Sequence, residues 1–104
     1  MKNSYFENGF INLNYDESSF GFFRIYNSTF DNIEGIKGSV INVMETLDKN
    51  FELDFNNSVF RNNYSSRYGG VIYTIEETSS KNIKFNNCEF YNNTSKFGKC
   101  FAFY

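Results

Sequence analysis

Few side chains in this sequence could perform chemistry, because none of its 104 residues is a histidine. Without His, the Ser-His-Asp and Cys-His arrangements of nucleophilic catalysis are excluded. Acid–base hydrolysis would need converging carboxylates, yet most of the twelve acidic residues stand in polar connecting stretches. Asp54 is the exception. It recurs at the same place in an internal repeat as Arg24 and Lys84, which predicts a row of alternating charges rather than an acid–base pair. We therefore expect a protein that is not an enzyme.

The two cysteines, Cys88 and Cys100, stand on consecutive predicted strands of one repeat. A disulfide bridge between them is geometrically feasible and would contribute about 3 kcal/mol in the chain-entropy model. The alternative is two free, buried thiols. Two thiols without His are too few ligands for a structural zinc ion, so we expect no metal and no other cofactor.

Aromatic and basic residues in the last two repeats are the candidates for binding a protein partner. Tyr and Arg are the residues that most often contribute large interface energies. Here they gather in or beside polar stretches, where we expect them to be exposed. The alternative is that half of the tyrosines lie flat over the hydrophobic core. The candidate partner-binding residues are Tyr64, Arg67, Tyr68, Tyr73, Tyr91 and Phe97.

A repeated sequence motif determines where these residues lie in the predicted fold. "NNSVFRNN" at 56–63 returns as "NNCEFYNN" at 86–93, and related phrases are "YNSTFDN" at 26–32 and "KNSYFEN" at 2–8. The four copies are anchored on Phe6, Phe30, Phe60 and Phe90, with spacings of 24, 30 and 30 residues. A period of this size is typical of repeat architectures. We expect residues 1–104 to form one repeat module, cut from a longer array in which neighbouring repeats stack on it.

Each repeat contains the same succession of elements. Before the Phe stands an apolar–charged–apolar triplet, which is typical of a strand with one buried face. After the Phe come a polar turn, a glycine, a second apolar stretch and a polar connector. Because the turn signals do not favour hairpins, we expect each strand to pair with its copy in the next repeat, about 4.8 Å away. The triplets are Phe23-Arg24-Ile25, Leu53-Asp54-Phe55 and Ile83-Lys84-Phe85.

The sequence thus predicts an all-β fold, a right-handed parallel β-helix (a solenoid) of about three to four short coils. The right hand follows from the strong preference of parallel crossovers. The competing folds are an antiparallel β-sandwich and an all-helical protein. The repeat period and the absence of Asn-Gly and Asp-Gly turns argue against the former, and the β-favouring composition argues against the latter.

Asn and Phe have structural roles in this prediction. Asn tolerates the left-handed conformation of a sharp corner, and stacked Asn amides can bond in a ladder along the axis. Stacked rings would fill the interior. The predicted first ladder is Asn3, Asn27, Asn57 and Asn87, the second is Asn8, Asn32, Asn62 and Asn92, and the ring stack is Phe6, Phe30, Phe60 and Phe90.

Composition excludes several classes of partner. The net charge of −2 gives no electrostatic basis for binding nucleic acid. No apolar run reaches the roughly 18 residues of a membrane span. N-glycosylation triplets begin at Asn27, Asn56, Asn63, Asn92 and Asn93 and are compatible with secretion. We expect a corner residue such as Asn27 to stay unmodified, and Asn63 or Asn93 to be open to glycosylation.

The stretches "FRNNYSSRYGGVIYTI" and "FYNNTSKFGKCFAFY" resemble the repeats of bacterial polymorphic outer-membrane proteins and other pectin-lyase-like right-handed β-helices. The same Asn-, Tyr- and Phe-rich repeats are similar to those of the scaffoldins of anaerobic gut fungi. The first resemblance implies a β-helix. The second implies a cellulosome cohesin that docks the dockerin domains of plant-cell-wall-degrading enzymes.

The function expected from residues and resemblance together is a non-catalytic, extracellular or cell-surface module that binds a dockerin-type protein domain. One alternative is a structural or adhesive β-helix segment of a cell-surface protein. Another is a carbohydrate-binding or lyase-like β-helix. These hypotheses differ in what the exposed aromatic residues should bind: one protein partner, nothing, or a polysaccharide.

Overall fold

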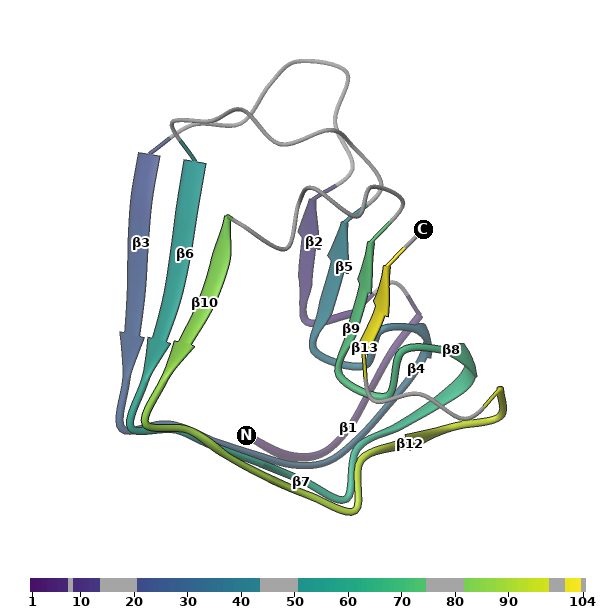
Figure 1. The fold of residues 1–104 in the computed structure, drawn as a ribbon. Coiled ribbons are helices and arrows are strands. Elements are labelled where there is room, and N and C mark those ends of the chain that lie inside the picture. The colour runs from purple at the N-terminus through teal and green to yellow at the C-terminus, as the bar shows by residue number, and fades with distance from the viewer. Residues whose placement is uncertain (8, 14–20, 44–50, 75–81, 98–100, 104) are drawn as a thin grey trace.

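The chain winds into stacked coils of parallel strands in the computed structural model, which describes residues 1–7, 9–13, 21–43, 51–74, 82–97 and 101–103 (Figure 1). Every pairing between the described strands is parallel. These strands form three sheets and no described residue is helical. The predicted all-β parallel β-helix is confirmed, which excludes the antiparallel sandwich and the helical protein. The right hand of the coil stays a prediction.

The sheets are the three walls of the solenoid, and each coil contributes to each wall. The first sheet contains β3 (Gly21–Tyr26), β6 (Phe51–Asn56) and β10 (Ile83–Asn86). The second contains β1 (Lys2–Phe6), β4 (Thr29–Lys37), β7 (Val59–Arg61), β8 (Tyr64–Tyr68), β11 (Glu89–Tyr91) and β12 (Thr94–Ser95). The third contains β2 (Ile11–Leu13), β5 (Ile41–Val43), β9 (Ile72–Thr74) and β13 (Phe101–Phe103).

The predicted register of the first sheet is confirmed. Phe23 and Ile25 lie opposite Leu53 and Phe55, which in turn lie opposite Ile83 and Phe85. The alternation of side chains along a strand turns these apolar residues inward. Leu53 and Phe55 are consequently almost fully buried.

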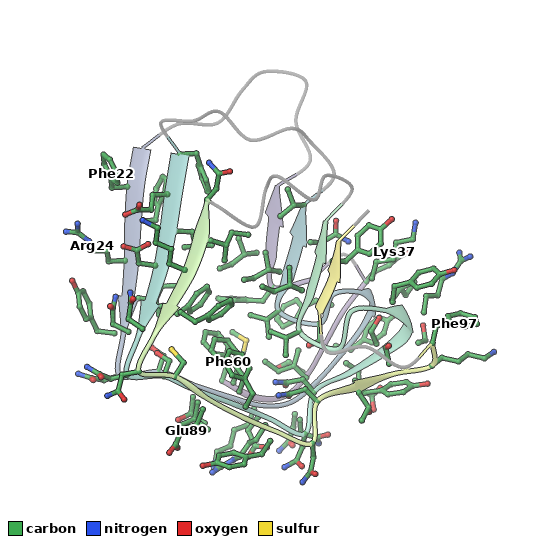
Figure 2. The ribbon with its side chains drawn as sticks, viewed as in Figure 1. Phe22, Arg24, Lys37, Phe60, Glu89 and Phe97 are labelled. Carbon is green, nitrogen blue, oxygen red and sulfur yellow. The ribbon has the colours of Figure 1, made fainter. Side chains whose placement is uncertain are left out.

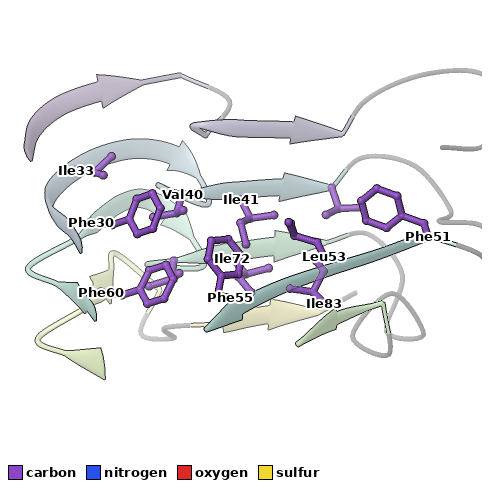
Figure 3. Close-up of a cluster of buried hydrophobic side chains, with 12 residues drawn as sticks. Phe30, Ile33, Val40, Ile41, Phe51, Leu53, Phe55, Phe60, Ile72 and Ile83 are labelled. Atoms are coloured by element: carbon purple, nitrogen blue, oxygen red, sulfur yellow. The ribbon is translucent and has the colours of Figure 1, made fainter. Parts of the chain in front are cut away.

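Aromatic rings and aliphatic side chains fill the space between the walls (Figure 3). The ring centroid of Phe60 lies 5.0 Å from that of Phe30 and 5.0 Å from that of Phe90, with interplanar angles of 8° and 7°. Phe55 and Phe85 form a second stack at 5.3 Å and meet Phe60 edge-on. Both geometries are favourable for aromatic pairs. The interior is therefore built from columns of residues that are one repeat apart.

Asparagines hold two corners of each coil in the left-handed conformation, which Asn tolerates better than most residues. The amide of Asn87 donates to Oδ1 of Asn57 at 2.7 Å, forming a rung of the first ladder. The φ angles are 50°, 52° and 54° at Asn27, Asn57 and Asn87, and 56°, 56° and 52° at Asn32, Asn62 and Asn92.

A second Asn at the later corner points inward and clamps the coil before it. Nδ2 of Asn63 donates to the Phe30 carbonyl at 3.1 Å, and its Oδ1 accepts from the Ile33 amide at 3.0 Å. Asn93 repeats the arrangement one coil later, bonding the Phe60 carbonyl and the Asn63 amide. Asn63 is fully buried, so the expectation that it is open to glycosylation is wrong for the folded chain.

The first repeat is displaced from its predicted alignment. Asn3 pairs with Asn32, whose Nδ2 donates to Asn3 Oδ1 at 2.8 Å, and Phe6 lies opposite Gly35. Asn3 in the first ladder and Phe6 in the ring stack are therefore wrong predictions, and Asn8 lies outside the described residues. Phe10 approaches Phe30 instead, with centroids 6.0 Å apart.

The conformation of the backbone at the corners explains this register. Gly9, Gly38 and Gly69 occupy one corner in successive coils, with φ of 79°, 69° and 67°. A Cβ at Gly69 would lie 2.0 Å from the Ile72 carbonyl oxygen. Only glycine fits that corner without strain, so the glycines, rather than the phenylalanines, align the first repeat.

The polar stretch between the Phe and the Gly of each repeat was predicted as a turn, and this is wrong for the two middle coils. It forms β8 in one coil and the second half of β4 in the preceding one. Ser65 of β8 points inward and is fully buried, and the carbonyl oxygens of Ile36 and Tyr68 both lie within hydrogen-bond distance of its hydroxyl. The described part of the chain contains no helix long and apolar enough to cross a membrane.

Candidate binding surface

An aromatic cluster lies at the edge between the second and third sheets. It consists of Tyr68 at the end of β8, Tyr73 of β9, Phe97 after β12, and the flanking Lys37 and Lys96. The rings of Tyr68 and Phe97 stack at 5.0 Å, and those of Tyr68 and Tyr73 lie 6.3 Å apart. Figure 2 shows Lys37 and Phe97 on the side of the molecule opposite Phe22 and Arg24.

The backbone holds this cluster in place. The register shifts between Gly35 and Lys37, so that Lys37 lies opposite Tyr68 across the strands. The Tyr68 carbonyl accepts from the Gly38 amide at 3.0 Å and from the Ser65 hydroxyl at 2.8 Å. The Phe97 amide donates to the Arg67 carbonyl at 3.2 Å. A surface whose rings are already fixed loses little conformational entropy on binding.

The members of the cluster differ in exposure. Phe97 is 54% exposed, Tyr68 is partly buried, and Tyr73 is only 8% exposed. Tyr73 therefore supports the surface, whereas Phe97 and the edge of Tyr68 are presented to a partner. Phe97 is also among the exposed large apolar residues of the described chain.

Positive charge borders the cluster. Nζ of Lys37 lies 5.1 Å from the centroid of Tyr73, and Nζ of Lys96 lies 5.9 Å from that of Phe97. Both distances are within the range of a cation–π interaction. Arg67 of β8, which precedes Tyr68 in the sequence, is exposed as well. Sequence reasoning missed the two lysines, although Lys37 and Lys96 end the polar stretches of the repeats before and after the one that carries Tyr64 and Tyr68.

Tyr64 and Tyr91, the remaining candidates, are separate from the aromatic cluster. Tyr64 is 40% exposed at the start of β8, opposite Thr94. Tyr91 lies opposite Arg61 on β7 and is 50% exposed. A hydrogen bond with Glu89 raises the pKa of Tyr91 above its usual value. The structure thus brings three of the six candidate side chains together in ring contacts.

The row of alternating charges is only partly as predicted. Nε of Arg24 lies 3.8 Å from Oδ2 of Asp54, but Nζ of Lys84 pairs with Oε1 of Glu52 at 2.6 Å. The longer Glu side chain reaches Lys84 diagonally, whereas Asp54 is 8% exposed and held close to the sheet. Burial raises the pKa of Asp54, and the ammonium of Lys84 lowers the pKa of Glu52.

The sulfur of Cys88 lies 3.3 Å from the Phe55 carbonyl oxygen. Cys100 lies outside the described residues, so the predicted bridge stays a prediction. In the part of the chain that the structure describes, no group of three or more His, Cys, Asp or Glu side chains could hold a metal ion.

Comparison with known proteins gives one informative similarity. No family model matches the chain. No solved structure matches it either. Among curated proteins, the chain is similar to metabotropic glutamate receptor-like protein P of Dictyostelium discoideum, with 31% identity over 78 residues. The match covers 72% of this chain and 6% of that relative, so it concerns a small part of a much longer protein.

Proposed function

We propose that this chain is a non-catalytic protein-binding module of an extracellular or cell-surface protein, and that its partner docks on the aromatic cluster. The observation that carries the proposal is the stacked pair of Tyr68 and Phe97, fixed by the backbone and bordered by Lys37 and Lys96. Exposed, rigid aromatic side chains beside cations are typical of interface hot spots. The lysines favour a partner with acidic groups around an apolar contact.

The finer form of the proposal follows from the resemblance to fungal scaffoldins. In that form the module is a cohesin, and the partner is a dockerin domain of a plant-cell-wall-degrading enzyme. Such a pair should bind in a ratio of one to one, without any chemical change in either protein.

The second candidate is a structural or adhesive β-helix segment of a cell-surface protein. The similarity to a receptor-like protein of Dictyostelium favours it, because the matched stretch makes up only 6% of that relative. In this form the coils would connect or space other domains. A carbohydrate-binding or lyase-like β-helix is the remaining alternative.

Binding to immobilised chain discriminates between these functions. We expect a fungal dockerin domain to bind the wild-type chain, and Tyr68→Ala with Phe97→Ala to weaken this binding at least about 30-fold, the effect of losing one hot spot. Phe22→Ala is the matched control, because Phe22 is 70% exposed on the opposite side. It should leave the affinity unchanged.

Other outcomes would assign the function differently. An equal loss with Phe22→Ala would contradict docking on the aromatic cluster. Retention of soluble glucans or pectins without dockerin binding would favour the carbohydrate module. Binding of neither by a folded chain would reject the cohesin and favour the structural segment.

A further inference from the structure

The aromatic cluster is arranged along the axis of the solenoid. Lys37 lies opposite Tyr68 across the strands, and the ring of Phe97, from the following coil, stacks on that of Tyr68. Lys37 and Phe97 lie on the outer side of the walls (Figure 2). Neighbouring coils are about 4.8 Å apart, so these three residues form an outward row about 10 Å long.

A lysine stands at each end of this row. Nζ of Lys37 lies 5.1 Å from the ring centroid of Tyr73. Nζ of Lys96 lies 5.9 Å from the ring centroid of Phe97. The ring of Tyr68 lies between the other two rings, 6.3 Å from that of Tyr73 and 5.0 Å from that of Phe97. The surface therefore presents a cation, an apolar centre and a second cation, in that order.

The charges of these two lysines are not neutralised within the part of the chain that the structure describes. Neither Lys37 nor Lys96 forms an ion pair there. On the first and second sheets, by contrast, basic side chains pair with an acid of the neighbouring coil, as Arg24, Arg61 and Lys84 do. Unpaired positive charge on both sides of an apolar centre favours a partner with the complementary order: acidic, apolar, acidic.

The distance between the lysines indicates which secondary structure of a partner fits. Lys37 and Lys96 stand two coils apart, because β4 pairs with β8 and β8 with β12. Their backbones are thus separated by about 10 Å along the axis. Positions i and i+7 of an α-helix share one face and are about 10.5 Å apart, with i+3 and i+4 between them. Residues on one face of a strand are about 6.8 or 13.6 Å apart, which matches less well.

We propose that the aromatic cluster docks an α-helix of the partner protein, which lies along the solenoid axis and has acidic residues at i and i+7 and apolar residues at i+3 and i+4. The two carboxylates pair with Lys37 and Lys96. The apolar residues cover Tyr68 and Phe97, as the apolar stripe of an amphipathic helix does in other complexes. This inference rests on the proposed docking of a protein on the same cluster, and it names the element of the partner that docks.

Two designed peptides test this inference. Each is an alanine-rich helix of about 20 residues, long enough to be helical in water. The matched peptide has Glu at i and i+7 and Leu at i+3 and i+4. The control peptide has the same composition, but its two Glu residues stand at i+2 and i+5, on the opposite face. Fluorescence anisotropy with the 104-residue chain measures both affinities. We expect the matched peptide to bind about fivefold more tightly, the effect of two exposed ion pairs.

Variants of the chain locate the helix. Lys37→Gln and Lys96→Gln should each weaken binding of the matched peptide about twofold, the effect of one exposed pair. Lys84→Gln is the matched control, because Lys84 is an exposed lysine of the first sheet, and it should leave the affinity unchanged. Lys37→Glu should make a peptide with Lys at i and Glu at i+7 the tighter ligand. Circular dichroism verifies the helicity of the peptides and the fold of each variant.

The outcomes separate this inference from the proposed function. Equal binding of the matched and control peptides, or no binding of either, would overturn the inference. A dockerin domain that binds through Tyr68 and Phe97 but is unaffected by Lys37→Gln and Lys96→Gln would also overturn it, while the proposed docking on the cluster would stand. Binding of the matched peptide by a chain that binds no dockerin domain would support the helix and reject the cohesin.

Discussion

Asn63→Leu should lower the free energy of unfolding by about 3–6 kcal/mol, because it leaves several buried polar groups without partners at about 1–3 kcal/mol each. The amide of Asn63 joins the Phe30 carbonyl, the Ile33 amide and Oδ1 of Asn93, all inside the solenoid. Leu has nearly the same volume, so the effect reports the hydrogen bonds rather than a cavity. A loss of this size is a large part of the roughly 5–15 kcal/mol that stabilises a typical domain.

Urea denaturation followed by circular dichroism measures this effect. Asn62→Gly is the matched control, since Asn62 is the adjacent outward residue with φ of 56°, which glycine adopts freely. The control should change stability by less than about 1 kcal/mol. Equal stabilities of Asn63→Leu and the wild-type chain would show that the Asn63 hydrogen bonds do not hold neighbouring coils together.

Phe60→Ala should cost about 3–5 kcal/mol, the usual range for removing a buried aromatic side chain. Phe60 is fully buried and contacts four rings, two in its own stack and two edge-on. Its removal interrupts the column in the middle coil, where rings lie on both sides. We therefore expect the variant to be mostly unfolded at room temperature, as measured by the midpoint of thermal denaturation.

Two further variants distinguish the loss of core packing from a general sensitivity of the chain's stability to the loss of any aromatic ring. Phe60→Leu keeps much of the volume and should cost less than half as much. Phe22→Ala removes a ring that is 70% exposed and should be nearly neutral. If Phe22→Ala destabilised the chain as much as Phe60→Ala, the ring column could not be the main source of stability.

The strands of the first sheet could be predicted from sequence because their apolar residues alternate and recur at a constant spacing. Phe23, Leu53 and Ile83 occupy one column for this reason. The corner asparagines could also be predicted, since Asn57 and Asn87 occupy positions where most side chains would strain the backbone. Both features are local and repeat without interruption.

Other features depend on contacts between coils that no single repeat specifies. Asn63 and Asn93 look like polar surface residues, yet the carbonyls of Phe30 and Phe60 need an inward donor at that corner. The doubled Asn after each of these phenylalanines was the available signal. Likewise, Tyr68 and Phe97 are 29 positions apart in sequence and meet only because successive coils are stacked.

Cross-linking between coils tests the central claim, that residues one repeat apart lie side by side in parallel register. Ser28, Ser58 and Cys88 occupy equivalent positions, as the Ser28 amide bonds Ser58 Oγ at 3.2 Å and the Glu89 amide bonds the Ser58 carbonyl at 3.0 Å. Neighbouring coils place such residues about 5 Å apart, within reach of a disulfide, whereas two coils separate them by about 10 Å.

The decisive measurement is peptide mapping of the variants Ser58→Cys and Ser28→Cys, each with Cys100→Ser, after mild oxidation of the folded chain. We expect Ser58→Cys to give a disulfide with Cys88 in native buffer and little in urea, and Ser28→Cys to give none. Equal cross-linking of both variants, or none in the folded Ser58→Cys variant, would contradict the stacked parallel coil.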